Sequence, residues 1–160
     1  MEDIIASAQQ MMRRCVGAET AQENPGAVLG AALAGASGAG RDLVELFCAA
    51  GAGSFNGWVE QLVAESLGKE GVGVWPRLRW EDNGRPADLE ETSAAIVAPP
   101  RVAGDEVKAS LSWKMETASA LGGEVYRWEV AVAAAAVLME IPPFTEPDVA
   151  VAKDCARKAL

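Results

Sequence analysis

The chain has 160 residues, of which 50% are apolar and 23% are charged, so its composition is that of a globular protein with the length of one domain, residues 1–160. Its formal net charge of -9 argues against broad nucleic-acid binding and against anionic membrane surfaces, because both need a basic patch. No apolar run reaches the roughly 18 residues of a membrane span, and the acidic start MEDIIASAQQ lacks a signal-peptide layout. We therefore expect a cytoplasmic protein without nucleic-acid or membrane partners.

The first half of the chain alternates helical patterns with one strand. Apolar residues at positions 4, 5, 8, 11, 12 and 15 recur near helical spacing. Pro25 suits the first turn of a second helix, which runs into glycines that end it. The expected elements are a helix over residues 1–16, a helix over 25–40, a buried strand over 41–49, a loop over 51–57 in which Ser54 or Asn56 caps the next helix, and that helix over 57–66.

The second half begins with a stretch rich in glycine and charge and ends in two helices. A long helix that is mostly apolar is stopped by the proline-rich PPFTEP, and basic residues near the end of the last helix suit its dipole. The expected elements are one short strand within 68–91, strands over 92–99 and 105–113, a buried helix over 120–141, and a final helix over 148–160.

This alternation of strands and helices predicts an α/β domain with a mainly parallel sheet covered by helices. Ligand sites in such sheets lie at the carboxyl ends of the strands. The loop after Cys48, and the helix after that loop, are expected at such an end.

The number and spacing of cysteines and the absence of histidine exclude several kinds of catalytic and metal site. Cys15, Cys48 and Cys155 are odd in number, far apart and without C-x-x-C spacing, which predicts three reduced thiols rather than a disulfide framework or a zinc site. The chain has no histidine, which removes Ser-His-Asp catalysis, histidine metal ligands and a histidine base. We expect neither a metal nor a cofactor.

Tryptophan is frequent for this length. Trp58 and Trp128 fall in helical patterns and are expected in the core. Trp75 and Trp80 lie in the glycine-rich stretch, where two alternatives stay open: they line an apolar pocket or partner surface, or they pack locally. The nearby Asp82-Asn83-Gly84 is a signal for an exposed hairpin turn.

The segment EQLVAESLGKEGVG, Glu60–Gly73, raises the main functional question. It begins as an amphipathic helix and ends as a glycine-rich loop, with Glu65 and Lys69 at the boundary. One interpretation is a solvated carboxylate at a helix end, paired with Lys69. The other is a general base, because a partly buried carboxylate there can have a pKa raised toward working pH.

Three stretches of this sequence together resemble phosphoglucose isomerase of the kind fused to transaldolase in some bacteria. They occur in the family's order and cover most of residues 23 to 153. The most specific elements are E-S-x-G-K and the P-F-x-x-P-x-V-x-x-x-K ending. Because the family is built from sugar-isomerase (SIS) domains, the resemblance implies a three-layer, doubly wound, mainly parallel α/β fold and a single SIS-like domain. The three stretches are ENPGAVLGAALAGASGAGRD, FNGWVEQLVAESLGKEGVGV and GGEVYRWEVAVAAAAVLMEIPPFTEPDVAVAK.

The resemblance implies a chemistry of aldose-ketose isomerisation, in which a carboxylate moves a proton between adjacent carbons through a cis-enediol. The family's base is the glutamate of E-S-x-G-K, which corresponds to Glu65. The lysine that closes the last motif assists at the sugar ring oxygen or hydroxyls and corresponds to Lys153. A glutamine one helical turn before the base corresponds to Gln61.

The sequence also departs from the family pattern. The family enzyme has two SIS domains, a serine/threonine-rich phosphate loop and a histidine, whereas this chain has the length of one domain, offers Ser54 alone and contains no histidine. Glu146 replaces a glutamine that would contact a ligand, and Val72 replaces a lysine, so that the loop loses one positive charge and keeps that of Lys69. Each change weakens phosphate recognition.

Two function classes are compatible with these residues. The first is a repurposed isomerase or lyase-type enzyme with Glu65 as base and Lys153 as its helper, acting on a sugar-like or specialised metabolite bound by Gln61, Ser54, Lys69 and Glu146. The second is a non-catalytic SIS-like module for binding or assembly. Both predict a small-molecule ligand and a homodimer, or pairing with a second SIS-domain chain.

Overall fold

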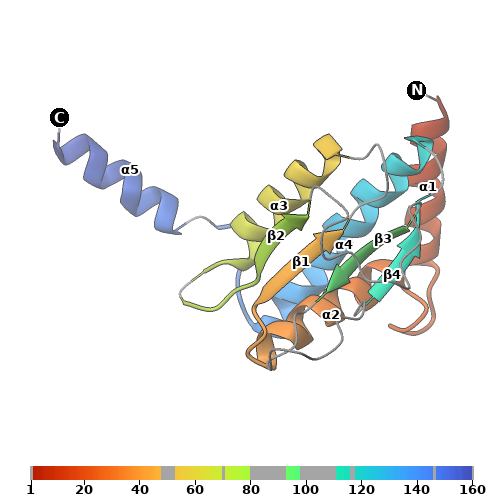
Figure 1. Cartoon of the computed structure of the whole chain (residues 1–160), viewed down its shortest axis with the longest axis horizontal. Helices are drawn as coiled ribbons and strands as arrows, with labels where there is room; N and C mark the ends of the chain where they lie inside the picture. Colours follow the sequence, from red (N-terminus) through yellow and green to blue (C-terminus); the bar gives the residue numbers. More distant parts are fainter. Residues whose placement is uncertain are drawn as a thin grey trace.

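The computed structural model describes residues 2–47, 53–69, 71–79, 93–97, 111–115, 118–145 and 147–159, and Figure 1 shows how they are arranged. In chain order the elements are α1 (Glu2–Val16), α2 (Pro25–Gly38), β1 (Leu43–Phe47), α3 (Gly53–Leu67), β2 (Trp75–Arg79), β3 (Ser93–Val97), β4 (Leu111–Lys114), the 3-10 turn η1 (Ala118–Ala120), α4 (Leu121–Met139) and α5 (Pro147–Ala159).

The helices predicted from apolar periodicity are confirmed, with one change at the start of α3. Asn24 caps α2, because its side chain accepts hydrogen bonds from the amides of Gly26 and Ala27. The helix α3 begins at Gly53, so residues 53–57 form its first turn. The prediction of a loop there was therefore wrong, and Ser54 and Asn56 lie within the helix instead of capping it.

The described strands form one sheet in the order β2-β1-β3-β4. β1 and β2 are parallel, because α3 carries the chain back to the starting edge of β1 before β2 begins. β3 pairs with the other side of β1 in antiparallel orientation, and β4 is antiparallel to β3. The α/β class is confirmed, while parallel pairing is found only between β1 and β2 among these strands.

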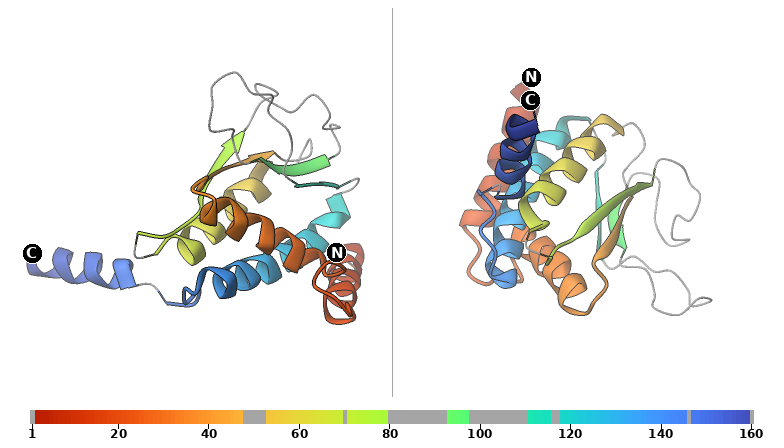
Figure 2. Two further views of the ribbon diagram at one scale, coloured as in Figure 1. Left: turned by 90° about the horizontal axis from the view of Figure 1, so that it is seen from below. Right: turned by 90° about the vertical axis from the view of Figure 1, so that its left-hand side faces the viewer.

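The helices α2, α3 and α4 lie on one face of this sheet, and α1 packs beside α4 (Figure 2). The core between the two layers is built from the apolar residues of β1 and of these helices. Trp128 on α4 is buried in it, and Trp58 on α3 is partly buried against it, as their helical positions predicted. The core residues that are fully buried include Leu29, Leu33, Val44, Leu46, Val59, Val63 and Leu67.

Close approach of α2 to α4 holds this layer together. The two helices touch where α2 presents glycine and α4 presents alanine or valine. A Cβ atom added to Gly30 would lie 2.8 Å from Cβ of Ala134 and would also collide with the carbonyl oxygen of Ala131. Only a residue without a side chain therefore fits at position 30.

Two cysteines lie in the described part of the chain, and both are free thiols, Cys15 buried and Cys155 exposed. Cys48 and the predicted turn at Asp82-Asn83-Gly84 lie outside the described residues. None of the described helices has the length and apolar character needed to cross a membrane.

The substitution Gly30→Ala is expected to lower the free energy of unfolding by about 2 kcal/mol, because the added methyl group forces α2 and α4 apart. Gly35→Ala is the matched control, since it lies in the same helix and its added Cβ would meet nothing within 4 Å. We expect the control to raise the free energy of unfolding by roughly 0.5 kcal/mol or more through helix propensity. Urea denaturation measures both, and equal effects of the two variants would contradict the packing argument.

Candidate functional site

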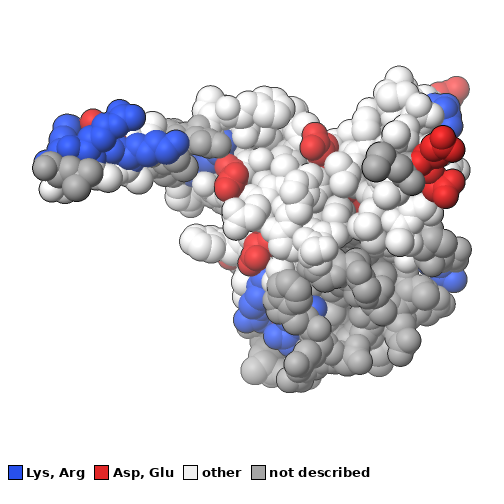
Figure 3. All heavy atoms as spheres, turned by 90° about the horizontal axis from the view of Figure 1, so that it is seen from above, with Lys and Arg blue, Asp and Glu red and all other residues white. Residues whose placement is uncertain are grey.

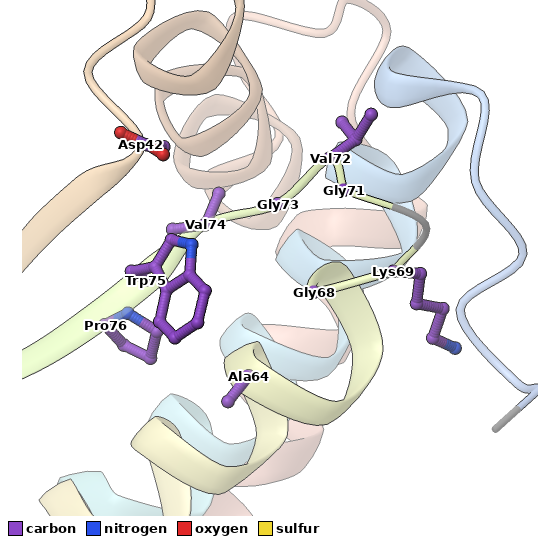
Figure 4. Close-up of a pocket in the computed structure, with 10 residues that line it drawn as sticks. All are labelled: Asp42, Ala64, Gly68, Lys69, Gly71, Val72, Gly73, Val74, Trp75 and Pro76. Atoms are coloured by element: carbon purple, nitrogen blue, oxygen red, sulfur yellow. The ribbon is translucent and has the colours of Figure 1, made fainter. Parts of the chain in front are cut away.

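A pocket of about 340 Å³ lies beside the segment Glu60–Gly73, which contains the candidate base Glu65. Figure 4 shows that it is formed where the end of α3 meets the glycine-rich loop and the first residues of β2. Its size is at the lower end of the range typical for small-molecule sites. The described residues that line it are Asp42, Ala64, Gly68, Lys69, Gly71, Val72, Gly73, Val74, Trp75 and Pro76.

The glycines of this loop have a structural role. Lys69 and Val72 exchange two backbone hydrogen bonds of 2.9 Å, which close a tight turn. Gly71 in that turn has a φ of +78°, a conformation that favours glycine. A Cβ atom at Gly73 would lie 3.0 Å from the carbonyl oxygen of Leu67. The loop therefore folds back on the end of α3. After the loop, the amide of Trp75 donates to the carbonyl oxygen of Asp42 at 2.7 Å, and β2 begins beside β1.

Lys69 is buried, and its ammonium points away from the pocket. Its Nζ donates to the carbonyl oxygen of Pro142 at 2.8 Å and to the carbonyl oxygen of Thr145. Figure 4 shows the side chain directed toward the segment between α4 and α5, on the far side from Trp75. Lys69 thus ties the end of α3 to that segment and is not paired with Glu65.

The pocket itself offers an apolar wall and one carboxylate. Trp75 is 70% exposed and lines it, which corresponds to the first alternative for this residue, whereas Trp80 lies outside the described residues. Asp42, which the sequence did not single out, is the carboxylate among the described lining residues. Since Lys69 directs its charge elsewhere, the pocket suits an uncharged or cationic ligand better than a phosphate ester.

The other residues predicted for the site do not converge with this pocket. Gln61 and Glu65 are exposed one turn apart on α3, with no described residue bound to either side chain. Ser54 is exposed at the opposite end of the same helix, about 16 Å from Glu65 along the axis. Lys153 is exposed on α5, which Figure 1 shows projecting from the body. Glu146 lies outside the described residues.

A second polar cluster escaped the sequence-based prediction. Glu124 and Arg127 are buried in α4, and their side chains form an ion pair of 3.3 Å between Oε1 and Nη2. The indole Nε1 of Trp113 donates to Oε2 of Glu124 at 2.7 Å, and the Arg127 guanidinium lies 5.1 Å from the centre of the Trp113 ring. Glutamate and arginine three residues apart inside an apolar helix are the signal that would have found this pair.

Burial controls the electrostatics of this cluster. It raises the pKa of the Glu124 carboxyl, and the nearby Arg127 cation, the Trp113 hydrogen bond and Arg14 oppose that effect. Burial also lowers the pKa of the Arg127 guanidinium, while Glu124 opposes that change. Both directions show that removal from water outweighs the attraction within the pair.

Comparisons of the chain with protein-family models, with curated proteins and with solved structures found no match. Among the residues that the structure describes, no group of three or more histidine, cysteine, aspartate or glutamate side chains is placed to hold a metal ion.

The substitution Lys69→Met is expected to lower the free energy of unfolding by about 2 kcal/mol or more, because two hydrogen bonds from a buried ammonium are lost and two carbonyl groups are left without their donor. Arg41→Met is the control, since Arg41 is an exposed cation that lies outside α5. We expect the control to change stability by less than about 0.5 kcal/mol. Thermal or urea unfolding distinguishes the two, and a Lys69 variant as stable as the control would show that the anchor contributes little.

Proposed function

We propose that this chain is an assembly module, an α/β domain that pairs with a second copy of itself through α5 and the apolar residues near the end of α4. The observation that carries the proposal is the position of α5, which projects from the rest of the molecule in Figures 1 and 2. Every side chain from Ala150 to Ala159 is exposed, and no other described helix or strand packs extensively against α5. A helix that buries no face gains little stability alone, so a partner surface is expected.

Exposed apolar residues lie on both sides of the junction between α4 and α5. Val137 is 77% exposed, Leu138 60%, Phe144 90% and Val151 62%. We call these four residues the junction patch. The four residues lie within residues 137–151 of the chain, and several large exposed apolar side chains near one junction mark a protein interaction site more often than a single one does.

Charge favours a second copy of this chain as the partner. The sequence of α5 contains three cations, Lys153, Arg157 and Lys158, and two carboxylates, Asp148 and Asp154, a net charge of +1, whereas the whole chain carries a net charge of -9. Figure 3 shows basic side chains gathered on the projecting helix, and both acidic and basic side chains on the body. A cationic helix on an acidic body of the same chain is attracted to the body of its partner.

Twofold symmetry would limit an assembly in which two copies exchange α5 to a dimer. If α5 of one copy covers the junction patch of the other, the reverse contact forms by the same twofold operation. The interface is then isologous and closes as a dimer. The junction patch and α5 adjoin in the chain, so one exchange would cover both of these exposed surfaces.

The proposal includes a more specific fold than the α/β class. We infer a single SIS-like domain of the three-layer, doubly wound type, related in sequence to the base-carrying half of a phosphoglucose isomerase. The burial of Phe47 supports it, because this side chain alternates with the core residues Val44 and Leu46 and so points to the sheet face away from the helices, yet is only 2% exposed. The cytoplasmic location remains an inference from the sequence.

A second candidate function is proton transfer by Glu65 on a small-molecule ligand. Gln61 and Glu65 support it, because they share one exposed face of α3 and are accessible to a ligand. Ser54 lies at the opposite end of α3 from Glu65, and α5, which carries Lys153, does not pack extensively against α3 within one chain. A lysine helper for Glu65 is therefore proposed to come from the partner's α5. The active unit for such a repurposed isomerase or lyase would be the assembled dimer.

The assembly proposal predicts a dimer in sedimentation velocity and equilibrium experiments between about 1 and about 100 µM. Replacing Val137 and Leu138 together by serine is expected to weaken association at least about tenfold, because it removes apolar area from the junction patch. Val125→Ser is the control, a 38% exposed valine at the other end of α4. A chain that stays monomeric at the highest concentration, or a control that dissociates as strongly as the double variant, would rule the proposal out.

Proton transfer is tested by incubating the chain with sugar phosphates and with neutral ketoses in deuterated water. The prediction is deuterium exchange at the carbon beside the carbonyl, which falls at least about a hundredfold in Glu65→Gln because the base is lost. Glu60→Gln, a neighbouring glutamate of α3 that is half-buried, is the control and should keep its rate. Mass spectrometry or proton NMR reads the exchange, and equal rates in all three proteins would remove Glu65 as the base.

A further inference from the structure

One wall of the pocket beside α3 is an exposed tryptophan. Trp75 is the first residue of β2 and lines the pocket, yet 70% of it is exposed to solvent. Figure 4 shows its indole extending toward Ala64 of α3. A ligand that enters the pocket can therefore cover this aromatic ring without displacing a core residue.

A carboxylate belongs to the same wall. Asp42 directly precedes β1, and its backbone carbonyl oxygen accepts a hydrogen bond of 2.7 Å from the amide of Trp75, so the two residues are neighbours where β1 and β2 begin. The Asp42 side chain is exposed, and no described residue forms a hydrogen bond or an ion pair with it. A carboxylate next to an open indole provides the two groups that attract an organic cation.

The polar backbone of the pocket does not favour an anion. The amides of Gly68, Lys69, Val72 and Trp75 already donate to backbone carbonyl oxygens. The Lys69 ammonium binds the carbonyl oxygen of Pro142 and is directed away from the pocket. These donors are therefore not available to an anionic ligand.

The end of α3 adds negative potential at the same place. Ala64 and Gly68 line the pocket, and they belong to the last turn of α3 and to the residue that follows it. Carbonyl groups at the C-terminal end of a helix favour a nearby cation. The last turn of α3 contains no basic residue that would fill this role. Arg41 and Arg77, which are close to Asp42 and Trp75 in the sequence, are not among the described residues that line the pocket.

We propose that this pocket binds a small organic ammonium ion, with the Trp75 indole against its alkyl groups and the Asp42 carboxylate as its counter-ion. A volume of about 340 Å³ suits a compact amine better than a nucleotide or a peptide. The net charge of -9 also raises the concentration of cations around the chain. The site goes beyond assembly and proton transfer, because neither α5, the junction patch nor Glu65 contributes a described lining residue.

The test is a titration of the full chain with choline chloride at constant ionic strength, followed by the backbone amide NMR signals of Gly71 and Gly73, which line the pocket. We expect saturable shifts of both signals. Asp42→Asn should weaken binding at least about fivefold, because the counter-ion is lost. Asp3→Asn is the control, an exposed aspartate of α1 that does not line the pocket, and it should change binding less than about twofold.

The contribution of the aromatic ring is measured in the same way. Trp75→Leu should weaken choline binding at least about tenfold, and Trp75→Phe should weaken it less, because phenylalanine keeps an aromatic face. Unchanged binding by Trp75→Leu would overturn the proposal. So would shifts that do not saturate, or equal weakening by Asp42→Asn and Asp3→Asn.

Two further ligands define the chemical class. The alcohol 3,3-dimethylbutan-1-ol has the shape of choline without its charge and should bind at least about tenfold more weakly, whereas equally tight binding would rule out a cation site. Tighter binding of choline than of ethanolamine supports a methylated ammonium held mainly by Trp75, and the reverse supports a primary amine held mainly by Asp42. Sedimentation of the same samples keeps a failure of this site separate from a failure of dimerisation.

Discussion

The packing of α4 against its three neighbouring helices is the constraint on which the rest of the structure depends. α4 contacts α1, α2 and α3, and the glycine and alanine residues between α2 and α4 bring their backbones close together. This contact places Trp128 in the core beneath the sheet. The same packing fixes both ends of α4. The buried pair of Glu124 and Arg127 lies in the first turns of α4, and the segment that Lys69 binds follows the end of α4.

The two ends of α4 therefore differ in chemical character. At its start, the buried ion pair of Glu124 and Arg127 lies beside a small cavity. After its end, the chain leaves the body as α5 and exposes apolar residues on both sides of the junction. The buried ion pair and the proposed dimer contact thus belong to one helix and lie at its opposite ends.

The helices were predictable because their apolar periodicity and caps are local. Asn24 and Pro25 mark the start of α2, and PPFTEP marks the end of α4, without help from distant residues. The first turn of α3 was not predictable in this way, because serine and asparagine, as at Ser54 and Asn56, favour a helix cap as readily as a helix interior. Strand direction was also beyond local reasoning, because β3 pairs with β1 across a long separation in sequence and the period-two pattern is the same in either orientation.

The sequence by itself determined the helices, the α/β class and the small residues that permit close helix packing, because each depends on spacing within one segment. Only the tertiary structure decided what the charged residues do. Lys69 looked like the partner of Glu65 four residues earlier, yet its ammonium binds carbonyl groups of Pro142 and Thr145, more than seventy residues away. Arg127 and Lys114 share a cavity with Arg14 for the same reason, since a side chain meets the groups that the packed helices and strands bring to it.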